Sequence, residues 1–279
     1  MKFSDSLVDY VAALGTCGMP NQEIVMRLVL EQGYSVPFAR QIVYAIQEEP
    51  QHGNRLTSAF KGKGPDIDTE KENLVLQLGD AAPTISIEQH SPRIVVLDNF
   101  LSEWECEKLC NDARALFAPS PLEMEPGQIG HQPTIRSSST ANILPHHCEL
   151  VDRIEARIER LTGWPRSRGE TLQIQKYGAG EQYVPHFDFF YPGCPGEEQA
   201  LANGGQRLAT LIIYLRQPQA GGATYFANLG MRVAPRRGSA LFFAYPDSSM
   251  AGGTLHGGDP VLMGEKWIVT KWFRQFDRV

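Results

Sequence analysis

The chain has 279 residues, enough for one large domain with a substantial core and a smaller appendage. Hydrophobic residues make up 42% and charged residues 21% of it, which excludes a disordered chain. The net charge of −6 disfavours a nucleic-acid-binding protein that works through a broad basic face. No window reaches the apolar length of a membrane span, and the N-terminus lacks the pattern of a secretory signal.

The five cysteines lack the spacing of a disulfide framework. Cys106 and Cys110 lie one helical turn apart, and we expect them to be buried thiols rather than metal ligands. This cysteine usage is typical of a reducing compartment and predicts a cytoplasmic protein. The sequence makes no prediction of oligomeric state.

Residues 1–48 predict a small module of three amphipathic helices, with candidate N-caps at Ser4, Asn21 and Ser35. Such a module could bind peptides or partner helices, or it could be a packing appendage on the main domain. Residues 49–83 are assigned to a linker, because the stretch 49–72 is polar and poor in apolar residues.

Residues 84–279 predict the main domain. An apolar run at 94–97 is followed by a helix that Ser102 can cap and by a second amphipathic helix at 149–162. Eight short strands follow, at 171–177, 184–190, 206–216, 222–227, 231–234, 238–245, 253–257 and 266–275. The pattern predicts a mainly β fold, a double-stranded β-helix or jelly roll, with the two helices on the outside of one sheet.

The segment from Phe189 to Gln206 is rich in glycine and proline. This composition argues against regular structure and suggests a lid over a site, with an ordinary surface loop as the alternative.

The most informative pattern is His186-Phe187-Asp188 together with the distant His256. Residues two apart on a strand leave the same face, so His186 and Asp188 can bind one metal ion. With His256 they form a set of two imidazoles and one carboxylate, which suits non-haem Fe(II) and oxygen chemistry. The other histidines in polar, loop-like surroundings are not expected to be ligands: His131, His146 and His147.

Lys266 begins the last predicted strand and alternates with apolar positions, so it points inward with Ile268, Thr270 and Trp272. A buried lysine needs a partner, which a bound anion or a structural salt bridge would supply. An Fe(II) oxygenase with this ligand set needs two further electrons, and a 2-oxo acid can supply them. The distal carboxylate of that acid would pair with Lys266. Lys271 falls on the opposite face and is expected to be solvated.

Five segments in order resemble the catalytic domain of collagen-type prolyl 4-hydroxylases: 172–177, 183–188, 204–215, 221–224 and 255–272. The resemblance covers about two-thirds of the chain. Members of that family are Fe(II)- and 2-oxoglutarate-dependent dioxygenases on a double-stranded β-helix. The resemblance therefore implies Fe(II), 2-oxoglutarate as cosubstrate and ascorbate as an accessory reductant.

The resemblance also implies roles for single residues. The iron ligands would be His186, Asp188 and His256, and the distal carboxylate of 2-oxoglutarate would be held by Lys266, Tyr177 and Thr224. The residues at positions that line the peptide groove around the target proline are Tyr183, Arg207 and Trp272. The chain departs from the family at Arg274, where family members carry a histidine that helps to orient the substrate peptide.

These features predict a dioxygenase that hydroxylates a prolyl residue in a peptide or protein. Two alternatives stay open. One is an oxygenase of the same fold that acts on another residue type, a small molecule or a nucleic-acid base. Enzymes that act on bases usually carry an arginine where Lys266 stands, and the acidic charge balance disfavours them further. The other is a non-catalytic peptide-binding module, which the complete triad disfavours.

Overall fold

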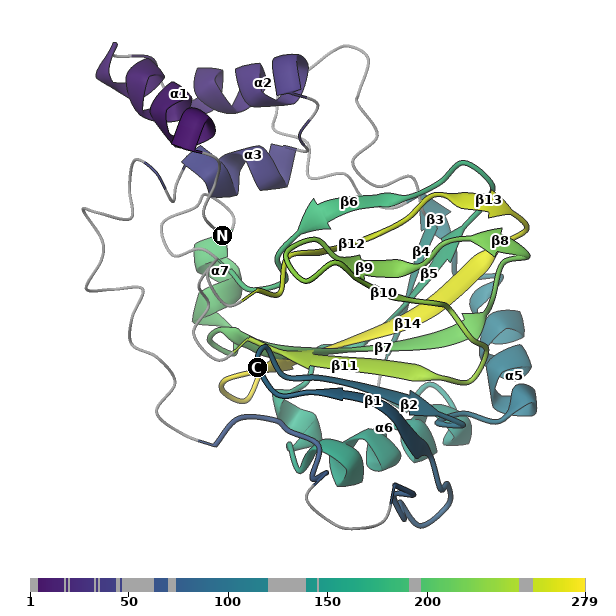
Figure 1. Cartoon of the computed structure of the whole chain (residues 1–279). Helices are drawn as coiled ribbons and strands as arrows, with labels where there is room; N and C mark the ends of the chain where they lie inside the picture. The colour runs from purple at the N-terminus through teal and green to yellow at the C-terminus, as the bar shows by residue number, and fades with distance from the viewer. Residues whose placement is uncertain are drawn as a thin grey trace.

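The computed structural model describes residues 5–17, 19, 21–32, 34, 36–43, 46, 63–69, 74–119, 139–144, 146–190, 197–245 and 253–278. In this part of the chain two β-sheets face each other and enclose the inner core (Figure 1). The arrangement is the predicted double-stranded β-helix. None of the described helices is long and apolar enough to cross a membrane.

The larger sheet has the strand order β1-β2-β11-β7-β14-β5-β4-β3. Its strands are β1 (Thr84–Gln89), β2 (Ile94–Asp98), β3 (Ala118–Pro119), β4 (Ser139–Ile143), β5 (Leu172–Tyr177), β7 (Arg207–Arg216), β11 (Ala240–Ala244) and β14 (Lys266–Arg274). The smaller sheet has the order β10-β9-β12-β6, with β6 (Tyr183–His186), β9 (Thr224–Phe226), β10 (Met231–Val233) and β12 (His256–Gly258). A separate pair is formed by β8 (Ala220–Gly221) and β13 (Val261–Met263).

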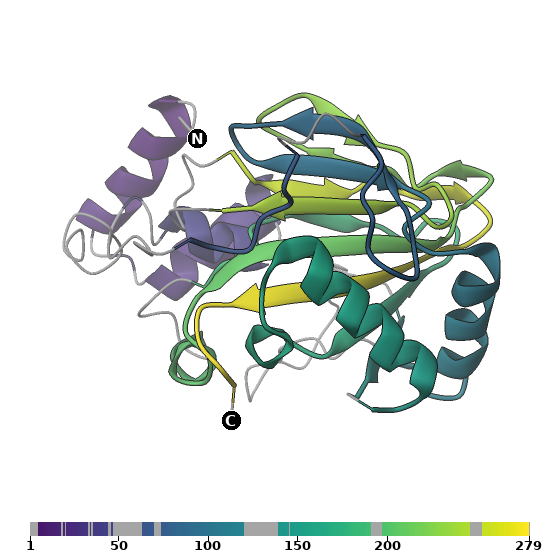
Figure 2. The ribbon, with the colours of Figure 1, turned by 90° about the horizontal axis from the view of Figure 1, so that it is seen from below.

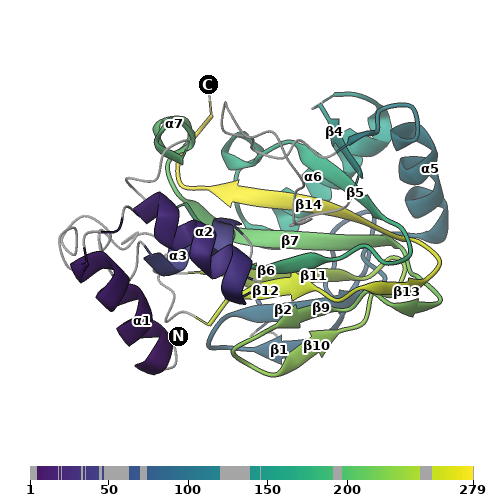
Figure 3. The same ribbon diagram turned by 90° about the horizontal axis from the view of Figure 1, so that it is seen from above.

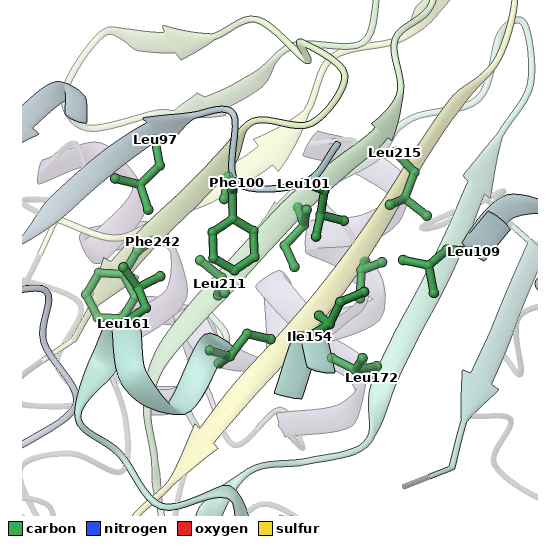
Figure 4. Close-up of a cluster of buried hydrophobic side chains, with 14 of the residues drawn as sticks. Leu97, Phe100, Leu101, Leu109, Ile154, Leu161, Leu172, Leu211, Leu215 and Phe242 are labelled. Atoms are coloured by element: carbon green, nitrogen blue, oxygen red, sulfur yellow. The ribbon is translucent and has the colours of Figure 1, made fainter. Parts of the chain in front are cut away.

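Two helices cover the outer face of the larger sheet, as the sequence predicts: α5 (Glu103–Ala113) and α6 (Glu149–Thr162) (Figure 2). Ser102 caps α5 through a capping box, since its hydroxyl accepts from the Glu105 amide while the Glu105 carboxylate accepts from the Ser102 amide. Ile154 and Leu161 of α6 pack with strand residues in one hydrophobic cluster (Figure 4). A short 3₁₀-helix, η2 (Arg166–Arg168), follows α6.

The expectation that Lys271 is solvated is wrong. Lys271 does lie on the face of β14 opposite to Lys266, but it is buried and its ammonium group contacts both carboxylate oxygens of Glu155, at 2.8 Å each. Glu155 belongs to α6, which covers this face of the sheet. A strand in the middle of a sheet has no solvated face when a helix covers one side and a second sheet covers the other.

We expect Lys271→Met to destabilise the fold by about 3–5 kcal/mol, because it leaves the Glu155 carboxylate buried and unpaired. Urea unfolding measures this change. The double variant Lys271→Met, Glu155→Met removes both charges and should recover most of the loss. A single variant within about 0.5 kcal/mol of the wild type, the usual range for a surface substitution, would contradict a buried pair.

The N-terminal helices are α1 (Asp5–Thr16), α2 (Asn21–Gln32) and α3 (Val36–Val43). Their buried residues Val11, Ile24 and Ile42 belong to the same hydrophobic cluster as Phe187 and Phe189, which follow β6. Helix α3 contacts β6, α2 packs against α3, and α1 contacts α2 (Figures 1 and 3). This packing favours the appendage over a freely tethered module, while the division into separate domains stays a prediction.

The predicted linker at 49–83 needs a correction. Residues 49–62 lie outside the described part of the chain, but the described residues from 63 to 83 pack on the main domain. Ile67 and Leu78 are buried in its core. Asp80 pairs with the buried Arg157 at 2.8 Å. The polar composition gave a wrong prediction because a few apolar and acidic residues are enough to anchor an irregular segment to a domain.

The segment from Phe189 to Gln206 also differs from its prediction. It contains a helical turn and a half, α7 (Glu197–Ala202), although its composition argued against regular structure. Residues 191–196 lie outside the described part of the chain, so the lid itself stays a prediction. Cys194 lies there too, whereas Cys106 and Cys110 are free thiols buried in the core, as expected.

Candidate metal centre and active site

The three predicted metal ligands meet between the ends of two paired strands. His186 is the last residue of β6, Asp188 lies just beyond that strand, and His256 is the first residue of β12. Strand β12 pairs with β6 so that His256 stands opposite His186. One ligand atom of each side chain lies within 4.8 Å of the other two, and all three side chains are buried. The cross-strand register thus completes the triad.

Main-chain carbonyl groups fix the orientation of both imidazoles. Nδ1 of His186 lies 3.0 Å from the carbonyl oxygen of Val184, and Nδ1 of His256 lies 3.0 Å from that of Thr254. Because a carbonyl only accepts, Nδ1 carries the proton and Nε2 keeps its lone pair. Burial, with a further contribution from His186, lowers the pKa of His256 to about 4, so this ring is neutral at neutral pH.

The Asp188 carboxylate faces both lone pairs. Its Oδ1 lies 3.4 Å from Nε2 of His186, and its Oδ2 lies 3.6 Å from Nε2 of His256. Burial alone would raise the pKa of Asp188, but the positive charge that His256 gains in acid, together with the neighbouring His186 and Arg207, holds it well below its usual range. Two imidazole nitrogen donors and one carboxylate oxygen donor converge here, which fits non-haem Fe(II).

Two residues that the sequence did not single out orient this carboxylate. The Thr210 hydroxyl donates to Asp188 Oδ2 at 2.6 Å, and the Tyr245 hydroxyl lies 2.8 Å from Thr210. Since the proton of Thr210 is engaged by Asp188, Tyr245 donates to Thr210. Partners of this kind fix the geometry of a metal-binding carboxylate.

A pocket adjoins the triad between the two sheets, with about 380 Å³ of empty space when its open mouth is included. Every predicted site residue except Arg207 lines it: His186, Asp188, His256, Lys266, Tyr177, Thr224, Tyr183 and Trp272. The remaining lining residues are Gln175, Ile212, Gly257, Gly258, Ile268 and Thr270.

Lys266 supplies this pocket with a buried positive charge. Its side chain is 4% exposed, and within the described residues no carboxylate forms an ion pair with it. The carboxylate that acts on it electrostatically, Asp259, is itself bonded to Arg232 at 2.9 Å. Burial lowers the pKa of Lys266 to about 8, against the opposing effect of Asp259. A buried cation without a counter-ion fits the distal carboxylate of a bound 2-oxo acid.

Hydroxyl groups surround the same end of the pocket. Nζ of Lys266 lies 5.5 Å from the ring centre of Tyr177 and 5.8 Å from that of Tyr214. The Tyr214 hydroxyl donates to Thr224 Oγ1 at 2.8 Å, so the Thr224 proton remains available for another acceptor. The Tyr177 hydroxyl donates to Gln175 at 3.0 Å. Tyr214 was not predicted as a site residue, although its segment carried the family resemblance.

The lowered pKa of Lys266 predicts a pH dependence. The anion binds the ammonium form, so the apparent affinity for 2-oxoglutarate should be constant below about pH 8 and fall above it. A KM for 2-oxoglutarate measured from pH 6.5 to 9.5 tests this. Lys266→Arg is the matched control, because arginine stays charged across this range. An equal rise of KM in both proteins would assign the effect to another group.

The predicted peptide-groove residues divide into two groups. Tyr183 stacks on His186, with ring centres 3.8 Å apart, and Trp272 lines the pocket. Arg207 lies behind Trp272, with its guanidinium carbon 4.2 Å from the ring centre. Its donors reach Glu170 at 2.7 and 2.8 Å and the carbonyl oxygen of Asp188 at 3.2 Å. The structure therefore places Arg207 outside the pocket lining, engaged with other protein groups.

His146 and His147 lie outside the triad. The side chain of His146 is 78% exposed and pairs with Asp152. His131 lies outside the described residues.

Known proteins are similar to this chain over the part that carries the fold and the site. Residues 172–274 match the family model of the 2OG-Fe(II) oxygenase superfamily. Prolyl 4-hydroxylase 5 of Arabidopsis thaliana is 35% identical over 216 residues, which cover 70% of this chain and 72% of that protein. Probable prolyl 4-hydroxylase 3 of the same plant is 36% identical over 203 residues, 65% of this chain and 69% of that protein.

One solved structure is similar to this chain in both sequence and fold. The viral collagen prolyl hydroxylase vCPH of Paramecium Bursaria Chlorella virus-1, in its complex with 2OG, has 30% sequence identity and a TM-score of 0.51. The match covers 65% of this chain and 95% of that protein. Fold, triad and anion pocket define an Fe(II)- and 2-oxoglutarate-dependent dioxygenase. Within that class, the chain belongs to the prolyl 4-hydroxylase family.

Proposed function

We propose that this chain hydroxylates a prolyl residue in a peptide or protein. The observation that carries the proposal is Lys266, a buried cation without a protein counter-ion among the described residues, in the same pocket as His186, Asp188 and His256. Its relatives named prolyl 4-hydroxylases support the substrate class.

Each part of the pocket has its own role in this proposal. His186, Asp188 and His256 hold Fe(II), while Lys266 binds the distal carboxylate of 2-oxoglutarate. Thr224 donates its free hydroxyl proton to the same carboxylate. When bound, iron and 2-oxoglutarate supply the oxygen activation and the two further electrons that hydroxylation of a carbon atom requires. The apolar side chains of Ile212 and Ile268 in the pocket lining limit the access of water to the reacting atoms.

The aromatic side chains at the pocket suit a prolyl substrate. Tyr183 and Trp272 offer flat apolar faces on which a pyrrolidine ring can pack. The indole Nε1 of Trp272 is buried and has no hydrogen-bond partner in the described part of the chain. A buried N–H without an acceptor is costly, and a carbonyl oxygen of the substrate peptide would satisfy it.

Two further parts of the proposal come from the sequence. Ascorbate would act as accessory reductant, and the protein would work in the cytoplasm. The state of its cysteines is compatible with a reducing compartment, since Cys106 and Cys110 are 4 residues apart and yet free.

The substrate can be identified by mass spectrometry of a host proteome with and without the active enzyme. We expect peptides that gain the mass of one oxygen atom at proline. The Asp188→Ala protein serves as the control for indirect effects. Gains in mass that appear only on other residue types or on nucleic-acid bases would contradict prolyl hydroxylation of proteins. So would the absence of any gain in mass on a macromolecule.

A further inference from the structure

Arg274, the residue at which the chain departs from its family, connects two parts of the molecule. It ends β14, and its side chain is 3% exposed. Its guanidinium group donates to the carbonyl oxygens of Ala200, of Asn203 at 2.9 Å and of Gly205 at 2.6 Å. These carbonyls lie in the last turn of α7 and in the residues that follow it. Arg274 thus caps the C-terminal end of α7.

The other side of the same guanidinium group reaches Glu170. Nη1 of Arg274 lies 3.1 Å from Glu170 Oε1, while Arg207 makes a bidentate pair with the same carboxylate. One carboxylate balances only one of the two arginines. The remaining positive charge lies against the helix C-terminus, whose partial negative charge favours a cation. This charge balance explains why Arg274 binds α7 and Glu170 together.

Phe190 ties the beginning of the same segment to the two arginines. The guanidinium carbons of Arg207 and Arg274 lie 4.6 and 4.8 Å from its ring centre. Its main-chain N–H and carbonyl bond to the side chain of Gln206, at 2.7 Å each. Phe190 comes two residues after the metal ligand Asp188. The two arginines therefore fix both Phe190 and the residues that follow α7.

We propose that Arg274 is a positioning residue for the substrate side of the active site. Through the shared Glu170 it holds Arg207 against the main chain of Asp188 and against the ring of Trp272, and it holds α7 beside them. This inference rests on the proposed function, because it assigns Trp272 to the substrate.

The two ends of β14 then have different roles, one at the peptide site and one at the 2-oxoglutarate site. Arg274 lies eight residues from Lys266, about 26 Å along an extended strand. Loss of Arg274 should therefore disturb the peptide site and leave the 2-oxoglutarate site unchanged. An arginine that served stability alone would affect both cosubstrates equally.

The test compares Arg274→Ala with the wild-type protein, with poly-L-proline as the probe substrate. We expect the KM for poly-L-proline to rise about tenfold, as for the loss of one charged hydrogen bond, with the KM for 2-oxoglutarate unchanged. Arg274→Lys keeps the charge without the planar fork, folds more readily and should show a smaller rise of the same kind. Unchanged KM values for poly-L-proline in both variants, or equal rises for both cosubstrates, would overturn the proposal.

Two further measurements sharpen the test. Glu170→Gln combined with Arg274→Ala should raise the KM for poly-L-proline by less than the product of the single effects, because the two act through one contact. Hydrogen exchange should accelerate at the amides of Phe190 and Gly205 in Arg274→Ala. If the wild-type protein leaves poly-L-proline unmodified, that result counts against the proposed function. The exchange then decides on Arg274: faster exchange at both amides supports positioning, and unchanged exchange at Phe190 refutes it.

Discussion

Asp188→Ala and His186→Ala are each expected to abolish stoichiometric Fe(II) binding and turnover of 2-oxoglutarate while the fold survives. Each variant removes one of three ligands from a site in which the two imidazoles are already oriented by carbonyl groups. Loss of a ligand should weaken metal binding by more than about a hundredfold, since loss of a supporting partner alone costs roughly 10–100-fold. Anaerobic titration calorimetry with Fe(II) measures the affinity, and release of succinate measures the turnover.

His146→Ala is the matched control for these variants. His146 is an exposed histidine outside the triad, so its loss should change neither iron binding nor turnover. The metal assignment would be wrong if Asp188→Ala and His186→Ala both retained one equivalent of Fe(II) and wild-type turnover.

Lys266→Ala is expected to weaken 2-oxoglutarate binding by roughly thirtyfold or more, with Fe(II) affinity nearly unchanged. The variant removes the counter-charge of the distal carboxylate and no metal ligand. Removal of one partner from a buried, charged hydrogen bond costs about 2–5 kcal/mol. The KM for 2-oxoglutarate and the Fe(II) affinity of the same preparation give the two numbers to compare.

Lys271 provides an internal control on the same strand. Lys271→Met removes a lysine from the opposite face, where it pairs with Glu155, and should lower stability without changing the KM for 2-oxoglutarate. An unchanged KM in Lys266→Ala would show that another cation binds the cosubstrate.

Alternation along a single strand was enough to predict one face of β14. Lys266, Ile268, Thr270 and Trp272 all line the pocket, as expected from the period of two. The same pattern failed for Lys271 because alternation assigns a residue to a face and says nothing of what covers that face. Helix α6 covers it, and only the tertiary structure shows this.

The metal ligands were predictable because they form a known chemical set at a recognisable spacing. Their supporting residues were not. Thr210 of β7 bonds to Asp188, and Tyr245, which follows β11, reaches Thr210 because β11 pairs with β7. A threonine in an apolar strand carries no local signal of that role. Arg207 was placed in the peptide groove by resemblance, whereas the structure engages it with Glu170. Ion-pair partners far apart in the sequence, such as these two, cannot be paired by pattern alone.

The most direct test of prolyl hydroxylation is the stoichiometry of the reaction with purified protein, Fe(II), 2-oxoglutarate and poly-L-proline. We predict that succinate and 4-hydroxyproline form in equal amounts, that both require Fe(II), and that both disappear in Asp188→Ala. The proposed function would be contradicted if neither poly-L-proline nor proline-containing protein extracts stimulated the consumption of 2-oxoglutarate and no hydroxyproline formed.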